Sequence, residues 1–269
     1  MLFLFRQLRR LELRKRSGQY CVYAVGEIVL VVLGILIAIQ INNWAEEKAD
    51  AKLEQIFISR LIEDIRVDVE VIGEFKAVAA HRLDLTELLI DSVANPEVAL
   101  ARPGEFLLAI IRSMAYSSPP LRSTTFEELK ATGKIELIID DTLKNLVFEY
   151  YNSDATSRQY RTYREARLLP IRNMLADVLP LEQQNWVHEE LGLTVRHYEI
   201  DSIQHIEVEA SWIVEAVDRI KQNHTLTSRL PQARVIHHNL RNNHQDRLER
   251  ARELLHALEA AHQNGGEND

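Results

Sequence analysis

The sequence predicts an all-α protein with one N-terminal transmembrane helix followed by an extracytoplasmic antiparallel helical bundle made of long helices. Three observations support this fold class. Residues 28–39 form an apolar run with no polar interruption. Beyond it, apolar residues recur at steps of three and four, the period of an amphipathic helix. The 269 residues include only seven prolines and nine glycines, so few positions interrupt a helix.

The apolar run belongs to a longer membrane span, which we place at residues 20–43. Twelve apolar residues are too few on their own, because crossing ~30 Å of hydrocarbon takes ~20 helical residues. The flanking residues are also mostly apolar and extend the run to a sufficient length. Tyr20, Tyr23 and Trp44 occupy positions typical of interfacial aromatic anchors.

Residues 1–19 form a basic segment that we expect to be cytoplasmic. Six basic residues precede the span against one acidic residue, Glu12, so residues 1–21 carry a charge of +5. The whole chain carries −8, which leaves −13 for the rest. Positive charge stays on the cytoplasmic side of a membrane span. The pattern therefore places the helical domain, residues 44–263, outside the cytoplasm and leaves residues 264–269 as a disordered tail.

Two other interpretations of the apolar run are weaker. A cleaved signal peptide would have a similar basic start and apolar length, but no Ala-x-Ala cleavage pattern follows the run. A buried helix of a soluble protein would not need the polybasic flank. An uncleaved membrane anchor is the favoured interpretation.

One face of the span is predicted to be a helix–helix interface. Glu27, Val31, Gly34 and Ala38 follow one another at steps of three and four. Gly34 and Ala38 form a small-xxx-small pair, which lets two helices approach closely. A carboxyl group in lipid is costly, so Glu27 is expected to face protein or water, and reaching back to Arg16 or the headgroups is the alternative. The expected partners are the lipid bilayer and either a second copy of the chain or another membrane protein.

Two motifs resemble a domain-of-unknown-function family of bacterial single-pass membrane proteins. The first is GEIVLVVLGILIAIQINNW at residues 26–44, and the second is TFEELKATGKIELI at residues 125–138, followed by the pair Tyr150 and Tyr151. The resemblance spans most of the chain and is loose beyond about residue 180. It implies a location in the bacterial inner membrane and a helical periplasmic domain. It implies no activity.

The stretch from residue 44 to residue 95 predicts one long amphipathic helix. It contains no proline, and we expect a break near Gly73 or Asp84, although a continuous stalk is the alternative. Its acidic residues are expected to form a solvated face: Glu63, Asp64, Asp68, Glu70 and Glu74.

The middle of the chain is divided by prolines and one glycine. Pro96 and Pro103 are expected to bound a short loop, and residues 106–114 to form a short helix. A loop is expected at residues 117–120. Two overlapping capping-box patterns, beginning at Thr124 and at Thr125, predict the start of a helix that ends at a glycine in the C′ position, Gly133.

A third long helix is predicted to start at residues 140–142 and to continue past Tyr163, with a kink or an end at Pro170. It carries the one local basic cluster of an acidic domain: Arg158, Arg161, Arg164 and Arg167. The cluster is a possible site for an anion or an acidic partner. Salt bridges to the acidic first helix are the structural alternative.

The C-terminal part is predicted to be helical again. Residues 210–222 form one helix, and short strands are possible within 194–196 and 206–208. Residues 227–262 show a heptad pattern whose middle is polar, with His237, His244 and Arg247 at seam positions. This polar seam indicates packing in a bundle and not a free coiled coil. Histidines in a seam can also make stability depend on acid pH.

The sequence contains no catalytic motif and gives no reason to expect a metal or a cofactor. Its glycines cannot form a phosphate-binding loop or a nucleophile elbow. Its single cysteine, Cys21, excludes thiolate metal clusters within one chain. His188-Glu189 begins like a zinc-protease helix, but the second histidine position is occupied by Gly192. The net charge makes nucleic acid an improbable partner.

We therefore expect a non-enzymatic interaction or scaffold protein of the cell envelope. The alternative is an extracytoplasmic ligand-sensing domain that signals through a membrane partner. A deep polar pocket would favour sensing, whereas an exposed apolar or charged surface would favour interaction.

Overall fold

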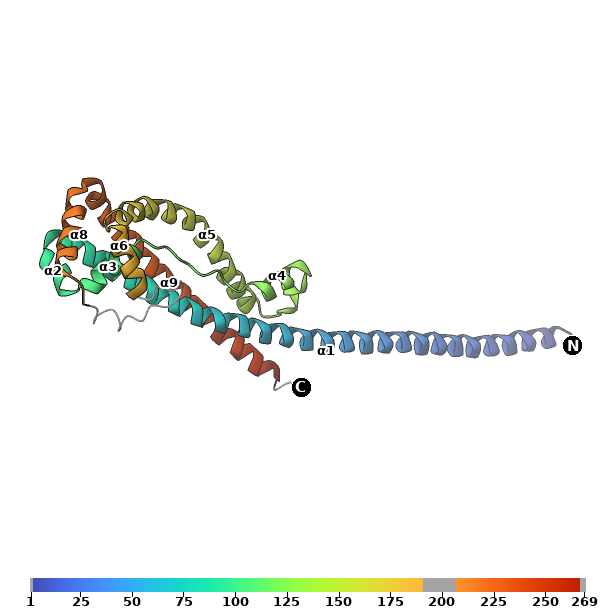
Figure 1. Ribbon diagram of the computed structural model, residues 1–269. Coiled ribbons are helices and arrows are strands. Elements are labelled where there is room, and N and C mark those ends of the chain that lie inside the picture. Colours follow the sequence, from blue (N-terminus) through green and yellow to red (C-terminus); the bar gives the residue numbers. More distant parts are fainter. Residues whose placement is uncertain (1, 191–206, 267–269) are drawn as a thin grey trace. The chain divides into compact units, whose positions relative to one another are not determined.

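The structure is a computed structural model that describes the backbone of residues 2–190 and 207–266 and the side chains of residues 26–153, 160–190 and 207–265 (Figure 1). Every regular element in these ranges is a helix, so the predicted all-α class is confirmed. The chain divides into two compact units, Met1–Ile56 and Phe57–Asp269. The possible strand at residues 194–196 lies outside the described residues, as do residues 267–269 of the predicted tail.

The first element is the helix α1, Leu2–Ala94, which begins in the first unit and ends in the second. The break expected near Gly73 or Asp84 is absent, so that prediction is wrong. A glycine inside a helix costs only ~1 kcal/mol relative to alanine. Ile72 and Ala79 are buried on either side of it, and their packing is enough to keep the helix continuous.

The first unit exposes the apolar run of α1. Between residues 28 and 41 the large apolar side chains are 48 to 72 % exposed. One helix among the described residues, Gly26–Ala94, is long and apolar enough to cross a membrane, and none of its most apolar window is buried. Length and composition make this segment a candidate membrane span.

One short helix lies where a loop was expected between Pro96 and Pro103, and the next confirms the short helix predicted at residues 106–114, although it begins and ends earlier. The helix α2 is Pro96–Ala101, and Asn95 caps it by accepting a hydrogen bond from the Glu97 amide at 3.1 Å. The helix α3, Pro103–Arg112, also begins at a proline. Proline suits the first position of a helix because its missing N–H would have no partner there. The prolines therefore start helices here, and the prediction of a loop was wrong.

The helix α4 is Thr124–Ala131, and a non-helical loop at residues 113–123 precedes it. Neither capping box forms, because the N-cap residue is Ser123 and its side chain makes no capping hydrogen bond. The helix ends as predicted. Gly133 has a φ of 69°, a left-handed conformation that favours glycine, and the 3-10 helix η1, Lys134–Leu137, follows it.

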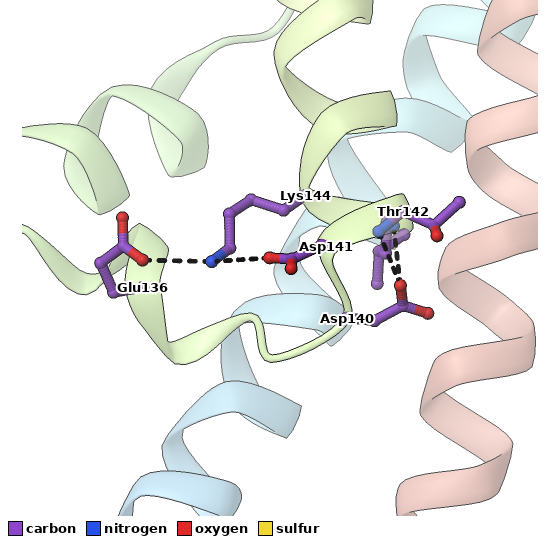
Figure 2. A network of polar contacts seen from close by, with 6 residues as sticks. Glu136, Asp140, Asp141, Thr142 and Lys144 are labelled. Atoms are coloured by element: carbon purple, nitrogen blue, oxygen red, sulfur yellow. Dashed lines mark hydrogen bonds and ion pairs between the residues drawn. The ribbon is translucent and has the colours of Figure 1, made fainter.

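The helix α5, Asp141–Ala176, starts at the predicted position. The Asp140 carboxylate accepts hydrogen bonds from the amides of Thr142 at 2.7 Å and Leu143 at 3.2 Å. Figure 2 shows the first turn, where Lys144 lies between the carboxylates of Glu136, at 3.1 Å, and Asp141, at 3.6 Å. Pro170 lies inside α5 and does not end it.

Three further helices complete the described part: α6 at Leu181–Glu190, α8 at Ala210–Gln222 and α9 at His224–Gly266. The prediction for residues 210–222 is therefore confirmed. Glu207 and Val208, which lie in the second possible strand, have no regular structure.

Within the second unit, α1 and α9 lie antiparallel. Arg66 pairs with Glu259 at 2.6 Å, whereas Phe75, further along α1, contacts the earlier His244 on α9 with ring centroids 6.3 Å apart. The helix α5 packs on α9. One continuous apolar core is formed by the following parts: the end of α1, α2, α3, the second half of α5, α6, α8 and the start of α9. The four residues from Phe106 to Ala109 of α3 are fully buried in it.

The two glycines that most affect helix geometry make a matched test. A Cβ atom would meet no atom within 4 Å at either Gly133 or Gly73, so backbone conformation alone decides the effect of alanine. We predict that Gly133→Ala lowers the free energy of unfolding by about 1–2 kcal/mol because of its positive φ. Gly73→Ala should raise it by about 0.5–1 kcal/mol. Denaturant unfolding of the full chain in detergent, followed by circular dichroism, measures both. Equal signs would contradict this backbone assignment.

Candidate functional site

The interface predicted on the candidate membrane span is uncovered in the structure. Glu27, Val31, Gly34 and Ala38 are all exposed, and a Cβ atom built on Gly34 would meet no atom within 4 Å. This face is therefore open to a partner helix, and whether a partner binds there stays a prediction.

The predicted basic cluster lies on α5, although the side chain of Arg158 is outside the described residues. The guanidinium of Arg164 lies 5.9 Å from the centre of the Tyr160 ring, and that of Arg167 lies 4.9 Å from the centre of the Tyr163 ring. Arg161 is partly buried. Among the described side chains, the acidic residues of α1 form no ion pair with the three described arginines, so the salt bridges weighed as the alternative do not occur there.

The TFEEL motif and the tyrosine pair, which follow the candidate membrane span in the chain, meet in space. Phe126, from the TFEEL motif, stacks on Tyr151 with ring centroids 4.3 Å apart and planes 8° from parallel. Phe126 also meets Phe148 edge-on at 5.7 Å. Tyr150 points to a different neighbour, the carboxylate of Asp68 on α1. The tyrosine pair therefore joins α4 on one side to α1 on the other.

Asp68 is the centre of a buried polar contact. Its side chain is 3 % exposed, and its two carboxylate oxygens accept hydrogen bonds from the Tyr150 hydroxyl at 2.8 Å and from the Arg122 amide at 3.0 Å. One helical turn earlier, the Asp64 carboxylate accepts a long hydrogen bond, at 3.4 Å, from the amide of Thr125 in the first turn of α4. A carboxylate near a helix N-terminus is stabilising. The Asp64 carboxylate of α1 therefore contacts the helix start that the capping box was expected to stabilise, and Asp68 binds the backbone just before it.

Two arginines hold the same loop from the other side. Arg247 of α9, which is 4 % exposed, donates to the Ser118 hydroxyl at 3.1 Å and to the Pro119 carbonyl at 3.0 Å. Arg82 of α1 donates to the Ser117 hydroxyl at 2.8 Å. We call residues 115–123 the anchored loop, because its backbone and side chains are bonded to α1 and α9.

The charges of this cluster affect one another. Burial raises the pKa of Asp68, against the opposing effects of the Arg122 amide, the Tyr150 hydroxyl and the charge of Arg247. Burial and the neighbouring Asp68 also raise the pKa of Tyr150 well above its ordinary value. The tyrosine thus stays protonated and can only donate to the carboxylate. The arrangement fixes the anchored loop and leaves neither group open to a substrate.

His237 and His244 lie in the same seam and are both fully buried. No described group makes a hydrogen bond of ordinary geometry with any of their four ring nitrogens. Burial lowers the pKa of each to about 4, and the next cause is the charge of Arg82 for His237 and of Arg247 for His244. Both imidazoles are therefore neutral at pH 7.

Sequence reasoning misassigned two acidic residues. Asp68 is buried and Asp64 is half-buried, whereas Glu63, Glu70 and Glu74 are exposed as expected. The spacing of the apolar residues did indicate one more buried position. Leu61, Ile65 and Ile72 face inward, and the helical period requires one further inward residue between positions 65 and 72. Val69 has the apolar side chain expected there, but it is only half-buried, and Asp68 occupies the inward position. Nothing in the sequence indicated that the compensating charge is Arg247, 179 residues away.

The described surface contains open hollows. One has a volume of about 600 Å³ and lies between α1 and α9, beside the Arg66–Glu259 ion pair. A second hollow of about 300 Å³ lies further along the same two helices, beside Glu87 and His238. Among the described residues, no group of three or more histidine, cysteine, aspartate or glutamate side chains could hold a metal ion.

The contribution of Asp68 can be measured by truncation. Asp68→Ala leaves the Arg122 amide and the Tyr150 hydroxyl without the acceptor that they have in the folded chain. We predict that the free energy of unfolding falls by about 2–5 kcal/mol, because each buried donor that loses its acceptor costs about 1–3 kcal/mol. The matched control, Glu70→Ala on the exposed face, should change it by less than about 0.5 kcal/mol. A similar small effect for both variants would show that the buried contact is not important for stability.

The seam histidines predict a loss of stability in acid. Each has a pKa of about 4 when folded against 6.5 when unfolded. As pH falls, the unfolded chain binds protons first, so their full contribution is present above pH 6.5 and is lost as the pH falls toward 4. We expect a loss of about 1–3 kcal/mol per histidine over this range.

The double variant His237→Leu/His244→Leu should reduce this dependence between pH 7.5 and pH 5, measured by thermal or denaturant unfolding. The exposed His256, replaced by leucine, serves as the control and should leave the dependence unchanged. Asp68, whose raised pKa has the opposite effect, is present in all three proteins. An unchanged pH dependence in the double variant would rule out the seam histidines as its cause.

Comparison with known proteins gives a match to one protein family. Curated proteins and solved structures give no significant match to the chain. Residues 27–152 match the model of a family of unknown function, which covers the apolar run, the anchored loop, α4 and the tyrosine pair. The match is narrower than the resemblance inferred from the motifs, which extended over most of the chain. This family is DUF6090, and the match over residues 27–152 agrees with the resemblance to a domain-of-unknown-function family that the motifs indicated.

Proposed function

We propose that this chain is a single-pass membrane-anchored protein whose helical domain binds other envelope components and has no enzymatic activity of its own. The observation that carries the proposal is the exposed apolar run of α1. Eleven large apolar side chains between residues 28 and 41 are about half exposed or more. At roughly 25 cal/mol per Å² of apolar surface, leaving such a segment in water is strongly unfavourable, and a lipid bilayer removes that penalty.

The proposed orientation has a cytoplasmic N-terminus. The charge of +5 on residues 1–21 against −13 on the remainder supports it, because basic residues stay on the cytoplasmic side. In a bacterium, which the family resemblance implies, the helical domain would then face the periplasm from the inner membrane.

The polar groups of the helical domain support binding more than catalysis. Asp68, Tyr150 and Arg247 are buried and are engaged in holding the anchored loop. The exposed groups are instead of the kind used in protein contacts: the small-residue face around Gly34 on the membrane helix, and the arginines and tyrosines of α5. A domain that presents such surfaces on a rigid scaffold is suited to holding a partner near the membrane.

Membrane integration and orientation can be tested together. In a Cys21→Ser background, we predict that a cysteine introduced at Ala51 in intact cells reacts with a membrane-impermeant maleimide, whereas one introduced at Ser17 reacts only after lysis. The protein should also stay in the membrane pellet after alkaline carbonate extraction and keep an N-terminal tag. Release by carbonate, loss of the tag or labelling of Ser17→Cys in intact cells would each contradict the proposal.

A further inference from the structure

We propose that a tyrosine–arginine face on α5 binds an acidic row on α1 of a second copy of this chain. The tyrosine–arginine face consists of Tyr160, Tyr163, Arg164 and Arg167. The acidic row consists of Glu63, Glu70 and Glu74. The inference rests on the proposed function in one respect, which is that a shared membrane brings the copies together.

The tyrosine–arginine face is made of two similar pairs. Tyr160 and Arg164 are four residues apart, as are Tyr163 and Arg167, so each pair lies on one side of the helix. The guanidinium groups lie 5.9 Å and 4.9 Å from the ring centres. The rings are 52 and 55 % exposed. Each ring thus supports a cation near the surface, an arrangement that favours a fixed position of the guanidinium.

This face has the composition of a binding surface for an anionic partner. Arginine and tyrosine are enriched at protein interfaces, where they account for much of the binding energy. A guanidinium that contacts a ring face keeps its in-plane N–H groups for a carboxylate, which it can bind with two parallel hydrogen bonds. Neither Arg164 nor Arg167 forms an ion pair among the described side chains. Their charge is therefore not neutralised by that part of the chain.

The acidic row has complementary charge and is exposed. Glu63, Glu70 and Glu74 are separated by seven and four residues and so share one face of α1. None of the three forms an ion pair in the described part of the chain. Their neighbours are already engaged, since Arg66 pairs with Glu259 and Asp68 points inward to Tyr150. The row is therefore a second surface whose charge has no ion-pair partner among the described side chains of its own copy.

The two surfaces also match in spacing. Arg164 and Arg167 are three residues apart, and Glu70 and Glu74 are four apart, so each pair spans about 5–6 Å along its helix. Two helices placed side by side could therefore form two arginine–carboxylate pairs, with the tyrosines covering the contact. Because the two surfaces differ, each copy can bind one neighbour with α5 and another with α1, a heterologous arrangement.

The strength of this contact depends on the membrane. An exposed ion pair strengthens a contact only about 1.4-fold to fivefold. Two such pairs would not hold soluble molecules together at low concentration. Anchored copies meet at a high effective concentration, which converts weak contacts into association. The contact should also weaken as salt screens the charges.

Charge reversal provides the test. Two full-length copies with different tags are co-expressed in one membrane, the membranes are treated with formaldehyde at low salt to crosslink neighbouring copies, and the co-purification of the two tags after solubilisation is measured. We expect Arg164→Glu/Arg167→Glu in both copies to lower the yield roughly fivefold to tenfold. Glu70→Arg/Glu74→Arg in both copies should do the same. A mixture of one copy of each kind should restore the yield, because every contact between unlike copies then joins opposite charges.

Matched controls separate this contact from other effects. Reversal of two exposed arginines on α9, Arg250→Glu/Arg252→Glu, should leave the yield unchanged. Circular dichroism and the melting temperature show whether each variant folds, and Arg167→Glu alone replaces the α5 double variant if half-buried Arg164 is needed for stability. Gly34→Ile reports on the membrane helix separately, and carbonate extraction reports on anchoring.

Three results would overturn the proposal. The first is an unchanged yield when the α5 arginines of a folded variant are reversed. The second is a loss on reversing α5 with no loss on reversing Glu70 and Glu74, which would assign the tyrosine–arginine face to a different anionic partner, such as lipid. The third is a mixture of reversed copies that fails to associate. If carbonate releases the protein while the charge-reversal pattern holds, the membrane anchor is wrong and the contact stands.

Discussion

A buried carboxylate and a buried guanidinium hold the anchored loop between two long helices, and the packing of the helical domain depends on them. Asp68 binds the Arg122 amide, and Arg247 binds Ser118 and the Pro119 carbonyl. Removing two opposite charges from water is costly unless each is paired and hydrogen-bonded. Tyr150 of α5 donates one hydrogen bond to Asp68, and the anchored loop supplies the other hydrogen bond of Asp68 and two of those of Arg247. Displacing the loop would therefore remove hydrogen bonds from both buried groups. The domain contains no disulfide to do this work, because Cys21 is the only cysteine.

Much of the fold could be predicted from the sequence, because hydrophobic periodicity and helix ends are local signals. The start of α5 at Asp140, the left-handed glycine at Gly133 and the extent of α8 followed from residues within a few positions of each feature. The errors were of two kinds. The first concerns Pro96 and Pro103, which begin helices. The sequence alone does not distinguish a proline that starts a helix from a proline that bounds a loop. The start of α4 is stabilised by Asp64 from 61 residues earlier, which no local pattern reveals.

Sequence reasoning predicted some features of the candidate sites correctly and missed others, and the difference has a physical reason. The heptad pattern correctly placed His237, His244 and Arg247 in the seam, because the 3.5-residue period fixes which side of a helix faces inward. It could not show what they would meet there. The inward turn of Asp68 was missed, since a charged residue on an apolar stripe is buried only when a distant residue compensates it. The sequence showed the arginines of the tyrosine–arginine face as a cluster of positive charge. The contacts between these arginines and the tyrosine rings were visible only in the structure.

Hydrogen exchange at the Arg122 and Thr125 amides tests the central claim most directly. Measurement on the full chain in detergent, at the resolution of single amides, compares them with amides in the middle of α1. If the carboxylates of Asp68 and Asp64 hold the loop as described, the Arg122 amide exchanges only when the domain unfolds, as slowly as the amides of α1 near Ile65. Thr125 is expected to be protected less, because its hydrogen bond is longer. Exchange of Arg122 at the rate of an open loop, with α1 still protected, would contradict the account.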